Sequence, residues 1–365
     1  MTIFLHKYLK MRIAAATIIM NSLLPQVADA QERDTVKTFV PMGSYTADLV
    51  VNMSGGIKTG ARYIGYATLG VEINPWQNGR FTFAAGSAHG GRPTEDLVGD
   101  LQYIDNNENG NRPIFLLYAN YSHTIGNVEI TAGIQDMTEV YGFCETSENF
   151  LNLGFSTNPV FYNTSFPTAP NTSLGVNVVW SLSDALTWCN GIYNGGVINS
   201  EDDNKYNLKH KLNKSKGYTA ISELQFSPTE NATFKLGGFY HTGVENWGAY
   251  GSVGGQLWQA GDRHIDAFAS AAFSSRKEEQ VMASLTAGAT LTSLLSDEGK
   301  DCLGLGLATA SPVGAKWETA IELNYRYQFN DYLYLMPDLQ YIINPAGEEG
   351  AKNALVGSVR LGFEF

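Results

Sequence analysis

The sequence predicts an all-β protein, an antiparallel up-and-down β-barrel of about sixteen strands that spans a membrane. Three observations predict this fold: long segments in which apolar and polar residues alternate, a last segment that ends the chain on an aromatic residue, and an unequal distribution of long and short connections. Fourteen or eighteen strands also fit, because such a pattern locates strand ends only to within a few residues.

The last segment, Ala354 to Phe365, has the clearest alternation. From Leu355 onward every second residue is apolar or glycine, and the residues between them include Ser358, Arg360 and Glu364. A strand turns successive side chains to opposite faces, so this segment has one apolar face and one largely polar face. Bacterial outer-membrane barrels commonly close with a strand of this kind that ends in Phe. An edge strand of a soluble sandwich would show the same alternation.

The two preceding segments repeat the pattern and disfavour a soluble sheet. Residues 317–329 and 332–343 alternate in the same way, with aromatic residues on the apolar face, and Asn330-Asp331 suits the tight turn between them. These segments are long for a soluble protein. They fit tilted strands that cross an apolar layer of about 25 Å, for which about 9–11 residues are needed.

Similar alternation recurs upstream and completes the count of sixteen. The additional predicted strands are 44–52, 60–73, 80–89, 112–123, 126–136, 172–181, 184–194, 217–227, 230–241, 247–259, 264–275, 280–292 and 301–310. An even number of strands places both ends of the barrel chain on the same side of the membrane, which is the periplasmic side in single-chain bacterial barrels.

The connections between these strands divide into long and short ones. The three longest, 90–111, 137–171 and 195–216, follow the third, fifth and seventh strands and therefore lie on one side. Most connections on the other side are tight, such as Ile125-Gly126 and Asn330-Asp331. Long external loops and short periplasmic turns are typical of outer-membrane barrels. Any plug or constriction must come mainly from the three long loops.

The amino-terminal residues predict export. Three basic residues precede the apolar run Ile13 to Leu24, and Ala28-Asp29-Ala30 offers small residues where a signal peptidase cleaves. The apolar run is too short to span a bilayer as a helix. We therefore expect residues 1–30 to be a cleaved signal peptide and residues 31–365 to form the barrel domain in the bacterial outer membrane.

Composition excludes some functions and supports the fold class. With a net charge of −12 and only 16% charged residues, the chain has the wrong electrostatic character for a nucleic-acid partner. The 38 glycines, 19 tyrosines and 18 phenylalanines fit tight turns and interfacial aromatic girdles. Cys144, Cys189 and Cys302 are odd in number and far apart, which does not suggest a disulfide framework, although a single bridge in the periplasm is compatible with them.

Sixteen strands leave a water-filled channel, and the alternation assigns polar side chains to its wall. The predicted lumen residues are Asp48, Asn52, Arg62, Glu72, Arg80, Glu129, Gln135, Glu322, Arg326, Asp338, Gln340 and Arg360. A wall of mixed charge with amides and tyrosines suits neutral solutes rich in hydroxyl groups, whereas an anion pore would carry a ladder of basic residues. Any one of these residues could also be a solvated wall residue, because such lumens are polar in general.

Several segments, spanning nearly the whole mature chain in order, resemble the carbohydrate-selective porin (OprB) family. They are YTADLVVNMSGGIKTGARYIGYATLGVEI (45–73), GRFTFAAGSAHGG (79–91), LVGDLQ (97–102), GIQDM (133–137), FLNLGFSTNP (150–159), LGVNVVW (174–180) and PDLQYIINP (337–345). The resemblance implies an outer-membrane channel through which mono- and oligosaccharides diffuse into the periplasm. It also implies a constriction formed by loops that fold into the lumen.

The resemblance further implies which residues lie near that constriction. The family's motifs fall on Arg80, His89-Gly90, Gly99 to Gln102 and Gln135-Asp136. We therefore expect the constriction and the solute path to include Glu72, Arg80, His89, Asp100, Gln102, Gln135 and Asp136. One segment departs from the family: residues 114–123, IFLLYANYSH, lack the Glu- and Trp-rich sequence that is usual there, which leaves the preferred sugar open.

Other functional classes have weaker support. An outer-membrane enzyme needs a nucleophile with a positioned base, but the histidines are scattered, no G-x-S-x-G motif is present, and no metal-ligand spacing occurs. His89 lies beside glycines and Arg92, which suggests a loop or constriction residue. A plugged, adhesin-like barrel could bind surface polysaccharide with the charged loop 195–216. A general-solute or ion porin is the main alternative.

The predicted partners follow from this assignment. They are carbohydrate solutes in the lumen, outer-membrane lipid and lipopolysaccharide around the wall, and the barrel-assembly machinery, which would engage the last strand through Phe365. No cofactor, metal or nucleic acid is expected. The sequence has no nucleotide-binding loop, so we expect solutes to move only down their gradients. Both a monomer and a homotrimer are compatible with the sequence.

Overall fold

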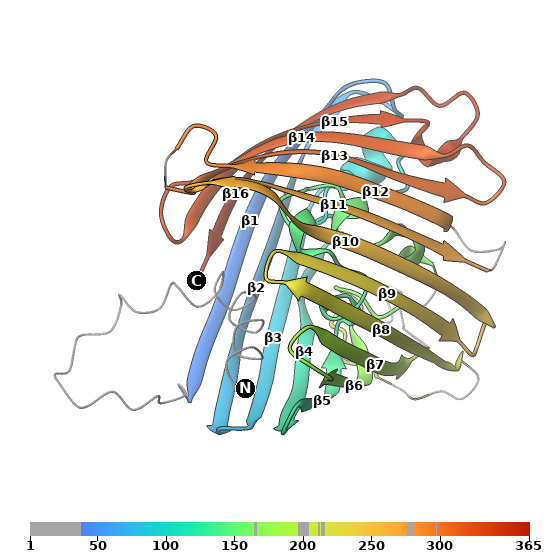
Figure 1. Ribbon diagram of the computed structural model, residues 1–365. Helices are drawn as coiled ribbons and strands as arrows, with labels where there is room; N and C mark the ends of the chain where they lie inside the picture. Colours follow the sequence, from blue (N-terminus) through green and yellow to red (C-terminus); the bar gives the residue numbers. More distant parts are fainter. Residues whose placement is uncertain are drawn as a thin grey trace.

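The computed structural model is a single closed antiparallel barrel (Figure 1). It describes residues 38–163, 166–195, 204–210, 212, 216–275, 281–296 and 298–365. The predicted signal peptide and most of the charged loop 195–216 lie outside these residues, so both remain predictions. No helix within the described ranges is long and apolar enough to cross a membrane.

Sixteen strands are present, as the sequence predicts. Each strand pairs with its neighbours in the chain, and the first pairs with the last, so the ladder of backbone hydrogen bonds has no free edge. The strands are β1 (Phe39–Ser54), β2 (Gly60–Trp76), β3 (Gly79–Gly90), β4 (Arg112–Ile125), β5 (Val128–Gln135), β6 (Ser173–Ser181), β7 (Leu186–Asn194), β8 (Tyr218–Thr229), β9 (Ala232–His241), β10 (Asn246–Ala260), β11 (Arg263–Ser274), β12 (Val281–Thr292), β13 (Asp301–Pro312), β14 (Glu318–Gln328), β15 (Leu333–Ile343) and β16 (Ala354–Glu364).

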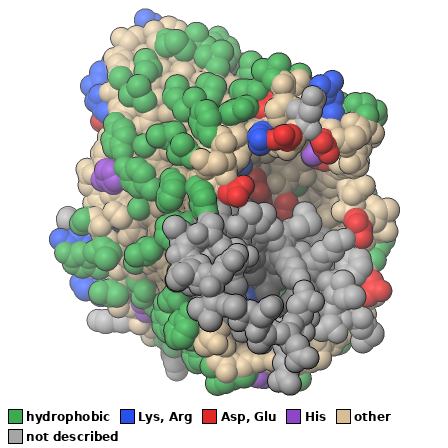
Figure 2. Space-filling view, turned by 90° about the vertical axis from the view of Figure 1, so that its left-hand side faces the viewer, with side chains coloured by type: hydrophobic (Ala, Val, Ile, Leu, Met, Phe, Trp, Pro, Cys, Tyr) green, Lys and Arg blue, Asp and Glu red, His purple; other side chains and the backbone are tan. Residues whose placement is uncertain are grey.

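The two faces of the barrel wall have the polarity that the alternation predicts. In β1, Leu49 is 50% exposed and its neighbour Asp48 is fully buried; in β16, Leu361 is 43% exposed and Arg360 only 7%. Figure 2 shows the consequence, with hydrophobic side chains gathered over the outside of the wall and acidic side chains around a hollow. An apolar outer band and a polar interior are what a barrel in a lipid bilayer requires.

The two ends of the described chain close the barrel together. β1 and β16 pair in register from Ser44–Glu364 onward, which puts Asp48 directly opposite Arg360. The carboxy-terminal residue also takes part, because Gly43 and Phe365 exchange two backbone hydrogen bonds of 3.0 and 2.9 Å. Closure at this seam therefore uses the last residue of the chain.

The strands β5, β6 and β7 are shorter than their neighbours, with 8, 9 and 9 residues against 14 in β4. The β5 ladder on β4 begins only at Ala119, so the first part of β4 has no β5 partner. A segment of the third long loop covers this edge: Leu116 donates its N–H to the carbonyl of Tyr206, and the Asn207 amide donates to the Leu116 carbonyl. This loop segment thereby satisfies backbone groups that a missing strand would leave open.

The other two long connections lie against the inner wall, within the outline of the barrel in Figure 1. The first inward loop, residues 91–111, contains one short helix, η1 (Thr94–Val98). The second inward loop, residues 136–172, carries four short helical turns, which are η2 (Met137–Glu139), η3 (Glu145–Ser147), α2 (Leu153–Ser156) and η4 (Pro159–Tyr162). A further turn, η6 (Pro345–Gly347), follows β15.

The three cysteines all lie within the described residues, and no disulfide joins them. Cys144 is buried in the second inward loop, Cys189 is buried in β7, and Cys302 is partly buried in β13. The odd number of cysteines in the sequence thus corresponds to separate thiols.

Candidate solute pathway

The first inward loop is held by an apolar contact. Leu97, Val98 and Ile104 of this loop form a buried cluster with the inward side chains Val50 and Ile64 and with residues of the closing strands. All five side chains are at most 2% exposed. Burial of this size stabilises a loop by about 1.5–3 kcal/mol for each large aliphatic side chain, so the loop is a packed part of the wall rather than a free flap.

A buried arginine connects the same loop to the barrel seam. Arg360 donates to both carboxylate oxygens of Asp48, at 2.7 and 3.1 Å, and to the carboxylate of Asp105 at 2.9 Å. It also donates to the side-chain oxygen of Asn106 at 2.9 Å. Both carboxylates accept charge-assisted hydrogen bonds from the one guanidinium, which offsets part of the cost of burying them. Two residues predicted for the lumen wall, Asp48 and Arg360, thus bind a loop.

Strand β14 contributes two glutamates that accept hydrogen bonds from loop backbone. Glu318 accepts from the N–H groups of Leu101 (2.6 Å) and Gln102 (2.9 Å) in the first inward loop. Glu322 accepts from those of Leu151 (2.7 Å) and Asn152 (2.9 Å) in the second. Both glutamates are fully buried. The alternation in residues 317–329 places both glutamates on the inner face, but only Glu322 was among the predicted lumen residues.

The two inward loops also contact each other. Asn106 donates its N–H to the Leu151 carbonyl at 2.8 Å, and Leu153 donates its N–H to the Tyr103 carbonyl at 2.9 Å. Gln340 of β15 joins them from the wall, because its amide donates to the Ile104 carbonyl and its oxygen accepts from the Asn152 amide. The loops therefore form one body on the inner face of β14 and β15.

The second inward loop packs across the opposite strands through aromatic rings. Phe150 and Phe155 stack with ring centroids 4.5 Å apart and meet Phe268 of β11 edge-on. Phe161 makes similar contacts with Phe239 and Tyr250 of β9 and β10, at 6.0 and 5.3 Å. Edge-to-face pairs of this kind add to the apolar burial. The second inward loop thus packs against the inner wall at β9, β10 and β11.

Polar groups on β8 and β9 hold the same loop. Glu223 accepts from the N–H of Gly142 at 2.9 Å. Lys235 donates its ammonium to the Phe143 carbonyl at 2.9 Å and to the Glu145 carboxylate at 2.8 Å. The wall therefore supplies both acceptors and donors to loop groups that would otherwise be buried without partners.

Gln135 and Asp136 lie at the root of the second inward loop. Asp136 accepts from the N–H groups of Thr138 (2.8 Å) and Ala169 (2.6 Å), which joins the two ends of the loop. Burial raises the pKa of Asp136 to about 6. Gln135 accepts from the Asn177 amide at 2.7 Å. Both side chains are buried, so their visible role is to shape the loop.

Asp100 and Gln102 lie in the first inward loop beside Glu318. Gln102 is fully buried and its amide donates to Glu318 at 3.2 Å. Asp100 is 6% exposed, and neither of its carboxylate oxygens has a hydrogen-bond partner among the described residues. Burial, with the nearby Glu318 and Glu108, raises the pKa of Asp100 well above its ordinary value. Within the described ranges, no group of three or more Asp, Glu, His or Cys residues is arranged to hold a metal ion.

A charged cluster on β2, β3 and β5 remains partly open. Arg80 lies 3.8 Å from a carboxylate oxygen of Glu72 and 3.6 Å from one of Glu129. The three side chains are 19%, 18% and 19% exposed, respectively. In contrast to the fully buried carboxylates of β14, these groups can exchange hydrogen bonds with water or with a solute. The structure brings together three residues that the alternation assigned separately to the lumen.

Two tyrosines and a loop glutamate lie on the same side of the interior. The Tyr118 hydroxyl of β4 donates to the carboxylate of Glu139 in η2 at 2.9 Å. Tyr66 of β2 packs on Phe115, with ring centroids 6.3 Å apart. Neither Tyr118 nor Glu139 was among the residues predicted from the sequence for the lumen or the constriction. The second inward loop has no alternation that would have indicated where Glu139 points.

The remaining wall residues also face inward and contact loops or each other. Asn52 donates its amide to the Leu97 carbonyl at 3.0 Å, and Arg62 pairs with Asp96 of η1 at 2.7 Å. The Arg326 guanidinium lies 4.1 Å from the centre of the Tyr334 ring. Asp338 accepts from the Gln340 amide at 2.9 Å.

His89 lies on the outside of the barrel, and its predicted place at the constriction is wrong. Its imidazole ring stacks on Tyr45 with centroids 6.1 Å apart and lies 5.9 Å from the Tyr63 ring. Both tyrosines are exposed on the outer face, and His89 is exposed with them. The reason is the strand period: β3 pairs with β2 without interruption from Phe81 to Gly90, so His89 shares the outer face with Phe83.

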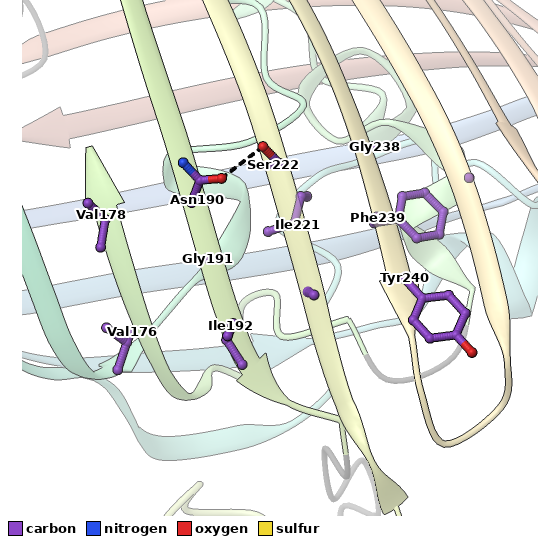
Figure 3. Close-up of a pocket in the computed structure, with 12 residues that line it drawn as sticks. Val176, Val178, Asn190, Gly191, Ile192, Ile221, Ser222, Gly238, Phe239 and Tyr240 are labelled. Atoms are coloured by element: carbon purple, nitrogen blue, oxygen red, sulfur yellow. Dashed lines mark hydrogen bonds between the residues drawn. The ribbon is translucent and has the colours of Figure 1, made fainter. Parts of the chain in front are cut away.

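A groove of about 600 Å³ lies on the outer wall over β6 to β10 (Figure 3). Its rim includes Val176 and Ile192, which are 47% and 59% exposed, and Tyr240. Asn190 and Ser222 share a hydrogen bond of 2.9 Å within it. Because these side chains face away from the lumen, the groove does not belong to the solute pathway.

Comparisons with known proteins agree with this geometry. Residues 72–245 and 243–365 match the family model described as carbohydrate-selective porin, OprB family. No curated protein matches the chain by sequence.

Solved structures show the same fold. The high-pH structure of Pseudomonas putida OprB is 18% identical, with a TM-score of 0.81, covering 90% of this chain and 94% of that chain. The low-pH structure of the same protein is 17% identical with a TM-score of 0.63, covering 90% and 93%. A triple mutant of the Rhodopseudomonas blastica porin is 12% identical with a TM-score of 0.54, covering 90% and 100%.

Proposed function

Because the chain belongs to the carbohydrate-selective porin (OprB) family, we propose that it is a passive, sugar-selective channel of the bacterial outer membrane. The observation that carries the proposal is the pairing of a closed sixteen-strand barrel with a partly open cluster of Arg80, Glu72 and Glu129 on its inner wall. Solutes would move only down their concentration gradients.

The chemistry of this cluster fits a neutral solute rich in hydroxyl groups. The guanidinium of Arg80 offers several N–H donors, and the carboxylates of Glu72 and Glu129 offer acceptors. At 3.6 and 3.8 Å the ion pairs are longer than direct hydrogen bonds, so donors and acceptors remain for a sugar. A hydroxyl group can therefore exchange its bonds to water for bonds to the wall, which lowers the cost of passage.

The net charge of the cluster disfavours an anion channel. One guanidinium faces two carboxylates, and the carboxylates of Glu318 and Glu322 in β14 are engaged by loop backbone. We infer that Glu72, Arg80 and Glu129 contact the solute, whereas Asp100, Gln102, Gln135 and Asp136 act through the loops in which they lie. Tyr118 and Glu139 are further candidates for solute contact, since a tyrosine ring and a carboxylate suit sugar C–H faces and hydroxyls.

Liposome swelling tests this proposal. Vesicles that contain the purified protein are compared in glucose, in longer malto-oligosaccharides and in neutral amino acids of glucose-like size. We expect sugars to cause faster swelling than amino acids of matched size. Equal rates at equal size would make the protein a general-solute porin, and no swelling with a folded barrel would favour the plugged, adhesin-like alternative.

The predicted surroundings of the barrel stay predictions. We infer that outer-membrane lipid and lipopolysaccharide contact the apolar outer face and that the assembly machinery engages the strand that ends at Phe365. Removal of Phe365 would test the second inference. Its expected result is a fall in the amount of folded barrel in the membrane rather than a change in the conductance of each channel.

A further inference from the structure

Strand β14 carries the attachment points of both inward loops. Its inward row begins Glu318, Ala320, Glu322, and the two glutamates are separated by one buried alanine. Glu318 bonds to the first inward loop and Glu322 to the second. Two loops that are separated in the sequence by β4 and β5 are thus held by one short stretch of a single strand.

The bonds use the acceptor capacity of both side chains. In Glu318, one oxygen accepts from the N–H of Leu101 and the other from the N–H and the amide of Gln102. The oxygen that binds Leu101 also accepts from the Ala346 N–H at 2.5 Å. In Glu322, separate oxygens accept from the N–H groups of the second loop, and one of them accepts from the Asn324 amide at 2.8 Å.

Burial separates these glutamates from solute contact. Glu318 and Glu322 have no exposed surface, whereas Glu72 and Glu129 of the open cluster keep 18% and 19% of theirs. Hydrogen bonds from backbone N–H groups to a buried carboxylate are worth more than neutral ones, and loss of the acceptor leaves the N–H groups without a partner. The glutamates therefore act on the loops and not on a passing sugar.

Contact between the loops makes the attachment cooperative. Asn106 and Leu153 bond across the loops through their backbones, and Gln340 binds one loop as a donor and the other as an acceptor. Release of one glutamate would therefore weaken the hold on both loops, because each loop also positions the other.

We propose that Glu318 and Glu322 are positioning residues that hold the two inward loops against β14 and thereby set the width of the channel. The proposal rests on the channel part of the proposed function and not on sugar preference. Without these acceptors the loops move away from the wall into the lumen space or fluctuate there. Both changes alter the size of the solutes that can pass and the noise of the open-channel current.

The test compares Glu318→Leu, Glu322→Leu and the two Gln variants with the wild-type chain. Gln keeps one oxygen acceptor and the side-chain shape but loses the charge. The Gln variants should therefore differ less from the wild type than the Leu variants do. Glu298→Gln is the matched control, because Glu298 lies in the turn before β13, is largely exposed and pairs with Lys300. Heat-modifiable electrophoretic mobility shows for each variant that the barrel is closed.

The readouts are the ratio of trisaccharide to glucose swelling rates and the noise of the open single-channel current. We expect a several-fold change in the ratio and greater noise in the Leu variants, smaller changes in the Gln variants, and wild-type values in the control. A purely structural role would reduce the yield of closed barrel and leave both readouts unchanged. If the barrel of a Leu variant does not close, the swelling ratio and current noise of the corresponding Gln variant test the proposal.

The proposal would be overturned if variants at both positions form closed barrels and show the swelling ratio and current noise of the wild type. That failure is distinguishable from failure of the proposed function. Vesicles with the wild-type barrel would still swell in the first case, whereas absence of swelling with every solute would overturn the channel function and this inference together.

Discussion

At the scale of single residues, inward-facing carboxylates of this barrel differ in what they can do. Glu72 and Glu129 keep exposed surface beside Arg80, whereas Glu318 and Glu322 are covered and bonded to loop backbone. All four residues are glutamates, and all four lie at inward-facing positions of their strands. What separates them is whether a loop lies over the wall at that point.

Replacement of Arg80 tests the open cluster. Arg80→Ala removes the donors and leaves Glu72 and Glu129 without their shared cation, so we expect slower sugar flux and a shift of ion selectivity toward cations. Because these ion pairs are long and partly exposed, the free energy of unfolding should fall by less than about 1 kcal/mol. Sugar swelling rates and reversal potentials in a salt gradient measure the two effects.

Arg263→Ala is the matched control for this experiment. Arg263 lies at the start of β11, where its guanidinium bonds to the carbonyl of Ser293 in a turn. Its loss should leave flux and selectivity at wild-type values. Unchanged flux and selectivity in Arg80→Ala as well would exclude Arg80 from the solute filter.

At the scale of the elements, the sequence predicted all sixteen strands. For nearly every wall residue it also predicted whether the side chain faces the lumen or the outside. A period of two is a local property, so each strand could be recognised without its neighbours. The exception is His89, where a motif carried over from the family was preferred to the alternation. The alternation alone would have placed His89 outside with Phe83.

The arrangement of the inward loops could not be predicted in the same way. Their residues have no period, and their decisive partners are far away in the chain: Gln102 bonds to Glu318 and Asn152 to Gln340. A resemblance to a family with inward loops implied their location but not their contacts. The bonds of Glu318 to the first inward loop and of Tyr118 to Glu139 were missed for this reason.

The first inward loop should respond to pH through Glu108. This carboxyl accepts from the Thr94 N–H, and burial raises its pKa to about 7 from the ordinary 4.5. A raised carboxyl pKa means that the folded loop binds the proton more tightly than the open loop. The packing is therefore strongest below about pH 4.5, weakens as the pH rises toward about 7, and then levels off.

Hydrogen exchange of residues 91–111 measures this dependence. After correction for intrinsic rates, we expect less protection at pH 8 than at pH 5, and a smaller difference in Glu108→Gln, which is neutral at both values. The buried Asp100 has a pKa raised in the same direction, so some dependence should persist in that variant. Equal protection of the wild-type loop at both pH values would contradict the assignment.

At the scale of the whole molecule, the seam between β1 and β16 joins barrel closure to the first inward loop. Arg360 binds Asp48 across the seam and Asp105 in the loop, and all three side chains are buried. A single residue thus connects the first and last strands with the loop that covers them.

Loss of this arginine should destabilise the closed barrel. Arg360→Met leaves two buried carboxylates without their cation, and a broken buried ion pair costs about 3–5 kcal/mol. Urea or heat titration of the electrophoretic mobility shift gives the change in stability. The double variant Asp48→Asn/Arg360→Met removes one of the two carboxylates left without a cation, so it should lose less stability than the single variant. An equal or larger loss of stability would contradict the role of Arg360 at the seam.

The proposed function requires neutral sugars to interact with the partly open wall as they pass through the channel. Single-channel current in planar bilayers, with a sugar added to one side, detects such an interaction. We expect maltose or glucose to cause brief, concentration-dependent interruptions of the ion current, and neutral amino acids of similar size to cause none. Identical traces with the sugar and with the size-matched amino acid would contradict the claim.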